Sequence, residues 1–284
     1  MKVRVNAKLN LTLNLGEVVN GYHLIDSVAV SVDVYDVVEA YARCDNQVTV
    51  KGLPNIPNDR NTAYLAACGF VKEFNCAGAD IVIDKRIPFG AGLGGSSADA
   101  AAVVYCMCKL YKQDVSSVKV RNICAKTGSD VNYMLRGGWA RLLGKGDDVE
   151  YFKSDKSLFF VLTEFDKSVL SKEAYSQFDK LGIRQPYADN GALINLLQSG
   201  KTQGIQKYFN NHLQPAVNAL SNYAQEYMDF CGRHNFDYNM TGSGSAYYLT
   251  FDNRKSAAEA VNLLNGSGFN SILCMSVPHG ITEL

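Results

Sequence analysis

The sequence has little that would tie it to a metal, a redox centre or a membrane. Among 284 residues there are one tryptophan, six prolines and four histidines. No two cysteines have the spacing of a zinc knuckle or a redox dithiol, and there is no run of about 18 apolar residues. Net charge is absent too, because 28 basic side chains balance 28 acidic ones. This excludes a broad attraction to nucleic acid or to an anionic membrane, so we expect a small ligand that is held locally.

Eight cysteines are scattered along the chain, and Cys106 and Cys108 are the closest pair. They lie in an alanine-rich stretch, where free thiols pack as small hydrophobic groups more often than they bind metal. This use of cysteine fits a reducing compartment. The first residues alternate like a strand and lack the apolar core of a signal peptide. We therefore expect a cytoplasmic protein without a membrane anchor.

The longest regular pattern is an alternation at residues 3–15. Every odd position is apolar and nearly every even one is polar, which is the period of a β-strand with one buried face. The polar face carries Lys8 and Asn10, which project the same way about 7 Å apart along the strand. The pattern predicts one long, half-buried strand that presents a lysine and an amide together.

The rest of the chain predicts an α+β protein. Strand and helix patterns lack the regular alternation of a parallel sheet, and a polar stretch near residue 150 divides them into two lobes, 1–150 and 151–284. The expected further strands are 28–41, 47–51, 79–84, 138–143, 158–163, 238–240, 246–251 and 271–278. The expected helices are 62–74, 96–111, 116–127, 172–181, 191–199, 205–209, 216–231 and 255–264.

A glycine-rich loop stands directly before the expected helix at 96–111. Gly90, Gly92, Gly94 and Gly95 lack Cβ atoms, so the loop can take positive φ angles and let a ligand approach its backbone. The helix start adds unpaired N–H groups and a partial positive charge. Together these features predict a phosphate-binding loop.

Two better-known phosphate loops fit this segment less well. A Walker loop needs a lysine before its serine or threonine, and here Gly95 is followed directly by Ser96. The spaced glycines of a dinucleotide fingerprint are matched, with Asp114 about 20 residues onward. However, residues 85–88 separate the strand from the first glycine, and 116–127 looks helical where a strand should follow. A nicotinamide oxidoreductase therefore stays only as an alternative.

Three further segments are candidates for a site. Ser129 can cap a short helix that begins at Asp130, and a helix start keeps a carboxylate ionised and fixed, although a purely structural role is the alternative. Residues 240–246 let backbone approach a ligand closely, but a hairpin turn explains them equally well. Tyr22 and His23 form an exposed pair that suits stacking on and bonding a flat ring, although a lone histidine in a turn more often has a structural role.

Taken in order, these segments resemble the GHMP kinase superfamily, whose mark is a proline followed by a glycine–serine phosphate loop that opens a helix. The matching stretch is PFGAGLGGSSADAA at 88–101. Within the superfamily, AKLNLTLNL at 7–15, NGYHLID at 20–26, GSDVNYMLRGG at 128–138 and MTGSGSA at 240–246 resemble the 4-diphosphocytidyl-2-C-methyl-D-erythritol kinases. The likeness covers nearly the whole chain. It implies an N-terminal lobe like domain 2 of ribosomal protein S5 and a ferredoxin-like C-terminal lobe.

The resemblance also implies an activity. It is the ATP-dependent, Mg²⁺-dependent phosphorylation of the C2 hydroxyl of 4-diphosphocytidyl-2-C-methyl-D-erythritol, on the methylerythritol phosphate route to isoprenoid precursors. The alternatives are another GHMP small-molecule kinase, of the mevalonate or homoserine type, and a non-catalytic nucleotide or sugar sensor on the same fold. The expected partner is the small-molecule substrate, and the expected assembly is a monomer or a weak homodimer.

The same resemblance implies roles for individual residues. Lys8 and Asp130 would be the catalytic pair. The substrate would be bound by Asn10, Tyr22, His23 and Tyr175. ATP would be bound by Asn61, Pro88, Phe89, Gly90, Ala91, Gly92, Leu93, Gly94, Gly95, Ser96, Ser97 and Ala98. A loop near the phosphates would comprise Thr241, Gly242, Ser243 and Gly244, and Ser97 would also be a metal ligand.

The chain departs from this family at five positions. Asn20 stands where the family usually has aspartate, and Ser96 and Ala98 replace a glycine and a serine of the phosphate loop. His212 and Gln214 stand where acidic residues are commoner. We expect these departures to affect substrate contacts and stability more than the reaction itself.

Overall fold

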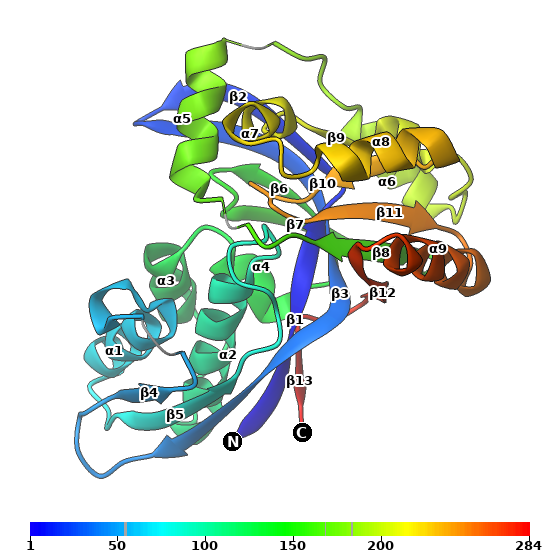
Figure 1. Ribbon diagram of the computed structural model, residues 1–284. Helices are drawn as coiled ribbons and strands as arrows, with labels where there is room; N and C mark the ends of the chain where they lie inside the picture. The colour runs from blue at the N-terminus through cyan, green and yellow to red at the C-terminus, as the bar shows by residue number, and fades with distance from the viewer. Residues whose placement is uncertain (54–55, 168, 183) are drawn as a thin grey trace.

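The computed structural model describes residues 1–53, 56–167, 169–182 and 184–284 as an α+β protein (Figure 1). Within these residues the strands are β1 (Lys2–Asn10), β2 (Thr12–Val19), β3 (Tyr22–Ala42), β4 (Thr49–Lys51), β5 (Ala79–Asp84), β6 (Trp139–Gly144), β7 (Asp148–Phe152), β8 (Phe159–Glu164), β9 (Asn210–Asn211), β10 (Tyr238–Met240), β11 (Tyr247–Phe251), β12 (Asn270–Val277) and β13 (Ile281–Glu283). The α-helices are α1 (Thr62–Phe74), α2 (Gly95–Leu110), α3 (Val118–Thr127), α4 (Val131–Arg136), α5 (Ser171–Leu181), α6 (Asn190–Gln198), α7 (Gln214–Leu220), α8 (Gln225–His234) and α9 (Arg254–Gly266). In Figure 1 helices α1 to α4 gather beside β1 and β3, and α5 to α9 gather toward the other end of the molecule.

The strand β3 organises the sheet. Hydrogen bonds join the described strands in the order β10–β11–β8–β12–β3–β1–β13, with the others attached to this path. β3 is 21 residues long and pairs with β1, β2, β5, β6 and β12. Because β13 pairs antiparallel with β1, the two chain ends lie side by side (Figure 1). β1 is therefore held on both edges, which fixes the side chains that it presents.

The predicted strand at residues 3–15 is in fact two strands that meet at a bend at Leu11. Its odd, apolar positions are buried as predicted. Its polar face is buried as well, since Lys8 is 5% exposed and Asn10 is 4% exposed. The prediction of a half-buried strand is therefore wrong, because the glycine loop and the C-terminal half of the chain both pack on the polar face.

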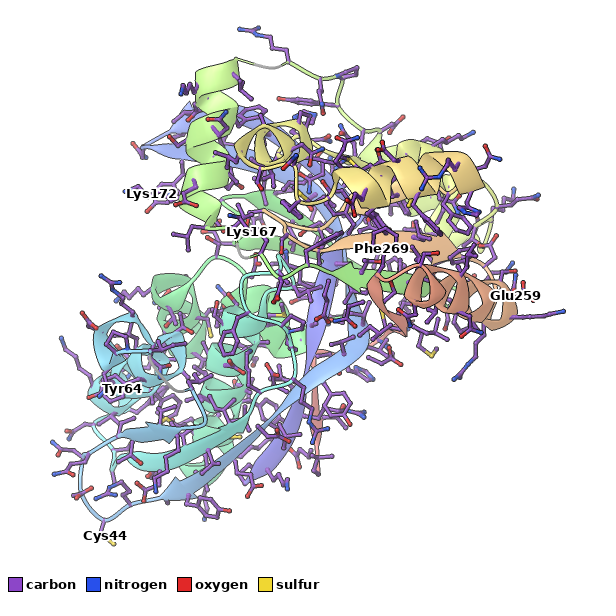
Figure 2. All side chains as sticks on the ribbon, in the orientation of Figure 1. Cys44, Tyr64, Lys167, Lys172, Glu259 and Phe269 are labelled. Atoms are coloured by element: carbon purple, nitrogen blue, oxygen red, sulfur yellow. The ribbon has the colours of Figure 1, made fainter. Side chains whose placement is uncertain are left out.

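The helix that follows the glycine loop is α2, which differs from the predicted helix by one residue at each end. Its small side chains allow close packing, and α2 contacts α1, α4 and β1. Cys106 and Cys108 are fully buried free thiols, as predicted. The exposed Cys44, by contrast, lies at the far tip beyond β3 (Figure 2).

Several boundaries differ from the sequence pattern. The predicted helix at 216–231 is two helices, α7 and α8, because Ser221 after α7 has an extended backbone. Residues 205–209 form a 3₁₀ turn, Ile205–Tyr208, and not an α-helix. β3 begins at Tyr22, well before the predicted strand at 28–41, because β2 folds back as its partner. The strands β7, β9 and β13 were not predicted, since each is short and gains its partner only in the folded sheet.

Hydrophobic packing does not stop at residue 150. The larger core cluster includes Leu193, Leu197 and Ile205 from beyond that point. The second cluster includes Leu13 and Leu15 from the start of the chain. The division into 1–150 and 151–284 thus stays a prediction. Of the helices that the structure describes, none has the length and apolar character needed to cross a membrane.

Candidate active site

A cleft of about 400 Å³ lies between the glycine loop, the end of β1 and the start of α5. The residues singled out from the sequence that line it are Lys8, Asn10, Asn61, Pro88, Phe89, Gly90, Ala91, Gly92, Leu93, Gly94, Gly95, Ser96, Ser97, Asp130, Tyr175, Gly242 and Ser243. Those that do not line it are Tyr22, His23, Ala98, Thr241 and Gly244. The fold therefore brings segments from both halves of the chain to one cavity.

The glycine loop has the backbone that its composition predicted. Gly90, Gly92 and Gly94 have φ angles of 63°, 77° and 71°, in the left-handed region that residues with a Cβ rarely adopt. The loop is anchored to β1, because the Lys8 N–H donates to the Leu93 carbonyl at 3.1 Å. Gly94 is the N-cap of α2, without a side-chain cap. The first N–H groups of α2 thus face the cleft from a fixed position.

Thr241 joins the glycine loop to the end of β1 through its hydroxyl group. Its hydroxyl accepts a hydrogen bond from the Asn10 N–H at 3.1 Å and donates to the Gly92 carbonyl at 3.4 Å. A Cβ on Gly92 would stand 2.1 Å from the Thr241 carbonyl oxygen, which is closer than atoms can approach. Gly242 and Ser243 lie beside it and line the cleft. Residues 240–246 therefore pack against the glycine loop and form part of the cleft wall.

Lys8 and Asp130 meet in the cleft. The Lys8 Nζ lies 3.6 Å from Asp130 Oδ2, and it also donates to Asn10 Oδ1. The Lys8 side chain is 6% exposed, whereas that of Asp130 is 27% exposed. Asp130 is the N-cap residue of α4, which begins at Val131 and has no side-chain cap. The prediction that Ser129 caps a helix beginning at Asp130 is therefore wrong, and the Asp130 carboxylate is not taken up by capping.

An aromatic group stands at the edge of the cleft. Tyr22 is 58% exposed, and the Lys145 ammonium lies 4.5 Å from its ring centroid. The His23 ring lies 5.6 Å from that of Tyr175 on α5. The His23 side chain is only 10% exposed, and its Nε2 is 2.7 Å from Asp179 Oδ1. The prediction of an exposed pair is right for Tyr22 and wrong for His23, because α5 covers the imidazole.

Asn61 lies where α1 begins, on the side of the cleft next to the loop. Its Oδ1 accepts hydrogen bonds from the N–H groups of Ala63 and Tyr64 at 3.1 and 3.2 Å. The residue is 4% exposed. The cap uses only the oxygen, and within the part of the chain that the structure describes no hydrogen bond takes up the side-chain NH₂, so this group can serve a ligand. A structural cap and a ligand contact are thus compatible at this position.

Two groups at the cleft were not found from the sequence. Lys145 lies in the turn between β6 and β7 and lines the cleft, but a single lysine between two glycines carries no pattern. Lys85 and Asp99 also line it, and Lys85 bridges Asp99 and the buried Asp36. Burial raises the pKa of Asp99 to about 7, with Lys85 opposing the shift and Asp36 adding to it. The only feature of the sequence that pointed to this second group was the basic pair Lys85 and Arg86 shortly before Pro88.

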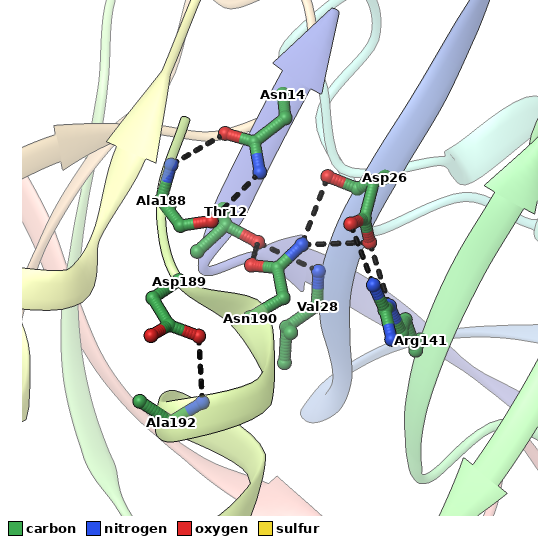
Figure 3. A network of polar contacts seen from close by, with 9 residues as sticks. All are labelled: Thr12, Asn14, Asp26, Val28, Arg141, Ala188, Asp189, Asn190 and Ala192. Carbon is green, nitrogen blue, oxygen red and sulfur yellow. Dashed lines mark hydrogen bonds and ion pairs between the residues drawn. The ribbon is translucent and has the colours of Figure 1, made fainter. Parts of the chain in front are cut away.

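A polar network fixes β3 just after the aromatic pair (Figure 3). Asp26 accepts two hydrogen bonds from Arg141, at 2.8 and 2.7 Å, and one from Asn190 Nδ2 at 2.7 Å. Asn190 Oδ1 accepts from the Thr12 hydroxyl at 2.7 Å. Burial acts to raise the pKa of Asp26, but these hydrogen bonds outweigh it and hold the pKa below its usual value. The network joins the start of α6 to β2, β3 and β6.

The cleft also contains an oxygen ligand that suits a divalent cation. Mg²⁺ takes few protein ligands when nucleotide phosphates supply the rest. In the described part of the chain there is no group of three or more acidic, histidine or cysteine side chains that could hold a metal ion without such help. The hydroxyl-bearing Ser97 lines the cleft in the first turn of α2. These residues therefore fit a cation that arrives with a nucleotide.

Comparison with curated proteins decides the family. Over 268 residues the chain is 32% identical to the 4-diphosphocytidyl-2-C-methyl-D-erythritol kinase of Clostridium acetobutylicum, which covers 90% of this chain and 93% of that protein. The chain belongs to this kinase family. The kinase of the same name from Clostridium tetani is 32% identical over 262 residues, again 90% and 93% of the two chains. The sequence model of the GHMP kinases N-terminal domain matches residues 61–140 of this family member.

Solved structures share the fold of the family. A crystal structure of 4-(cytidine 5′-diphospho)-2C-methyl-D-erythritol kinase has a TM-score of 0.78 and 23% identity, covering 98% of this chain and 100% of that one. A homoserine kinase from Cytophaga hutchinsonii has a TM-score of 0.76 and 18% identity, covering 99% and 96%. The α+β GHMP kinase fold is thus confirmed, whereas the likeness of each lobe to ribosomal protein S5 or ferredoxin stays a prediction. The shared fold does not by itself choose the substrate.

Proposed function

We propose that this chain transfers the γ-phosphoryl group of ATP to the C2 hydroxyl of 4-diphosphocytidyl-2-C-methyl-D-erythritol, a step toward isoprenoid precursors. The observation that carries the proposal is the Lys8–Asp130 pair, 3.6 Å apart in the same cleft as the glycine loop. Phosphoryl transfer needs mainly positioning and charge neutralisation, and this arrangement supplies both. The substrate is taken from the name shared by the curated relatives.

In the proposed reaction the C2 oxygen attacks the γ-phosphorus, and the bond from that phosphorus to ADP breaks. Asp130 accepts a hydrogen bond from the hydroxyl, orients its oxygen for the attack and takes up the hydroxyl proton as the new bond to phosphorus forms. Lys8 lies beside Asp130 and offsets the negative charge that develops on the transferring group. Asn10 holds the Lys8 ammonium through its side-chain oxygen. The pair thus combines an orienting anion with a stabilising cation.

The glycine loop and the start of α2 would hold the ATP phosphates. Backbone N–H groups at a helix start bind anions, and Gly92 permits the close packing that keeps the loop rigid. Asn61 lies on the same side of the cleft and would contact the nucleotide. When bound with ATP, Mg²⁺ neutralises phosphate charge and activates the γ-phosphorus, and Ser97 would be its protein ligand.

The cytidyl part would lie between Tyr22 and Tyr175. Tyr22 offers an exposed ring, and burial raises the pKa of Tyr175 to about 12, so its phenol stays neutral. His23 lies beside Tyr175 and would contribute at the edge of the base. Lys145 stands over Tyr22 and would face the negatively charged part of the substrate. This side of the cleft supports a flat ring joined to a diphosphate.

The test is ADP release by the purified protein with Mg·ATP and one acceptor at a time. We expect release with the cytidyl-methylerythritol and not with mevalonate or homoserine. Release with either of those alone would assign a different GHMP kinase activity. A protein that binds ATP yet releases no ADP with any acceptor would be the sensor, although its Lys8 and Asp130 argue against this. Protection from thermal unfolding by NADH and not ATP would indicate the oxidoreductase.

A further inference from the structure

A buried charge cluster lies beneath the glycine loop. The Lys85 Nζ is 2.5 Å from Asp36 Oδ2 and 2.8 Å from Asp99 Oδ2. The three side chains are 7%, 0% and 2% exposed. Burying such ions is costly, and well-packed apolar side chains often stabilise a fold as well or better. Stability alone therefore explains the cluster poorly.

The cluster joins the two ends of the loop. Lys85 lies just before the loop, and Asp99 lies just after it in α2. Asp36 on β3 also accepts hydrogen bonds from the backbone N–H groups of Arg86 and Ile87, at 2.6 and 2.7 Å. The entry of the loop is thus fixed to β3, and one ammonium fixes the exit to the entry.

The ammonium also lies near the start of the helix that would receive phosphate. A Cβ on Gly95, the first residue of α2, would lie 2.9 Å from the Lys85 Nζ. Both Lys85 and Asp99 line the cleft. The Asp99 Oδ1 is buried and has no hydrogen-bond partner among the described residues. The ammonium therefore lies close to the first turn of α2 and is bound to the next turn through Asp99.

We propose that Lys85 is a positioning residue for the phosphate loop, which binds Asp36 and Asp99 together and so holds the loop ends at the separation that ATP requires. Asp99 is the link from Lys85 to α2. The loop contains no lysine. Lys85 lies outside the loop and acts on it by fixing the backbone at its two ends. The inference rests on the proposed function, because it takes the ATP phosphates as the ligand of the loop.

The test separates positioning from stability. Asp99→Ala removes the link to α2, leaves the Lys85–Asp36 pair balanced in charge and keeps a residue that favours helix. We expect the KM for ATP to rise on the order of ten-fold or more, which is the loss of one charge-assisted hydrogen bond. The kcat at saturating ATP and the KM for the cytidyl substrate should change less than about two-fold. Asp99→Asn, whose amide oxygen can still accept from Lys85, should recover most of the ATP affinity.

Lys85→Met should lose more ATP affinity, and Lys119→Met is its matched control. Lys119 lies on α3 in an exposed pair with Glu73 at 3.5 Å. If Lys85→Met does not fold, the ATP affinities of the two Asp99 variants test the inference. An Asp99→Ala protein with unchanged ATP affinity overturns the inference, as does one in which all kinetic constants worsen together with Tm. A wild-type protein that does not bind ATP contradicts the proposed function itself and removes the basis of the inference.

Discussion

Lys8 and Asp130 differ in their surroundings although they form one pair. Lys8 is buried on a strand that has partners on both edges, and Asn10 holds its ammonium. Asp130 precedes a short helix and is the more open of the two. Lys8 is thus the more firmly held of the two residues, and Asp130 is the more accessible from the cleft. The expected phosphoryl transfer therefore depends on one positive charge at Lys8 and one negative charge at Asp130.

Asp130→Asn should keep the shape of the side chain and remove its charge. We expect turnover to fall by roughly 10² to 10⁴, because the hydroxyl loses its ionic acceptor. ATP binding should stay close to wild type, since the glycine loop is untouched. Steady-state ADP release and calorimetric titration with ATP measure the two quantities. A variant with near-wild-type turnover would show that Asp130 has no part in the reaction.

Tyr22→Ala should raise the KM for the cytidyl substrate and leave the KM for ATP unchanged. The exposed Tyr22 ring is the proposed stacking surface, and one stacking contact is worth about 1–3 kcal/mol, or roughly five-fold to 150-fold in KM. Tyr41→Ala is the matched control, because Tyr41 is an exposed tyrosine at the other end of β3. Equal KM values for the two variants would exclude the stacking role.

Among the elements, the glycine loop and residues 240–246 depend on each other. The loop carbonyls of Gly90 and Ala91 accept hydrogen bonds from the N–H groups of Ser245 and Ala246, at 3.3 and 3.2 Å. Thr241 adds its contact to Gly92. The phosphate loop of the N-terminal half is therefore shaped in part by a turn near the C-terminus. Neither segment has its functional shape alone.

Gly92→Ala should damage ATP binding more than any other single-methyl change in the loop. The new Cβ would collide with the Thr241 carbonyl, and the φ angle of 77° disfavours any residue but glycine. We expect a loss of about 1–3 kcal/mol in stability and a clear rise in the KM for ATP. Gly232→Ala is the control, because that glycine of α8 has open space around it. Thermal unfolding and ATP titration of both variants test this, and an unchanged Gly92→Ala protein would contradict the packing argument.

In the molecule as a whole, buried polar groups join β2 and β3 to the C-terminal half of the chain. His212 Nδ1 accepts from the Leu15 N–H at 3.1 Å, which ties the residue after β9 to the middle of β2. Burial holds the pKa of His212 below its usual value of 6.5. The Asp26 network joins α6 to the sheet in the same region (Figure 3). The neutral imidazole and the ionised carboxylate are both native-state requirements.

These two contributions to stability should therefore be lost on acidification at different pH values. A histidine with a lowered pKa stabilises the fold above about pH 6.5, and this contribution is lost as the pH falls through its native pKa. Asp26, also lowered, contributes above its usual value of 3.8 and loses this only in stronger acid. The contribution of His212 to Tm, measured from pH 8 to 4, should decline first below pH 6.5, whereas Asp99, whose pKa burial raises to about 7, acts in the opposite direction over the same range. His212→Asn, whose side-chain oxygen can accept from Leu15, should flatten that first decline, and an unchanged slope would exclude His212 as its cause.

Much of the site could be predicted from the sequence because it is local. The glycine loop before α2 was expected from the glycines themselves, since only they permit its backbone. Lys8 and Asn10 were expected on one face because alternate residues of a strand point the same way. The family followed from the order of these motifs. Such features depend on neighbours in the chain, which a sequence displays directly.

What only the tertiary structure decided depends on residues far apart in the chain. The burial of His23 under α5 and the covering of the polar face of β1 arise from packing between the two halves. The contact of Thr241 with Gly92 and the link of Lys85 to Asp36 and Asp99 cross many residues and follow no period. Local sequence determines backbone conformation and which face of an element is apolar. Long-range packing decides which polar groups meet, because it sets the distances on which charge and hydrogen bonding depend.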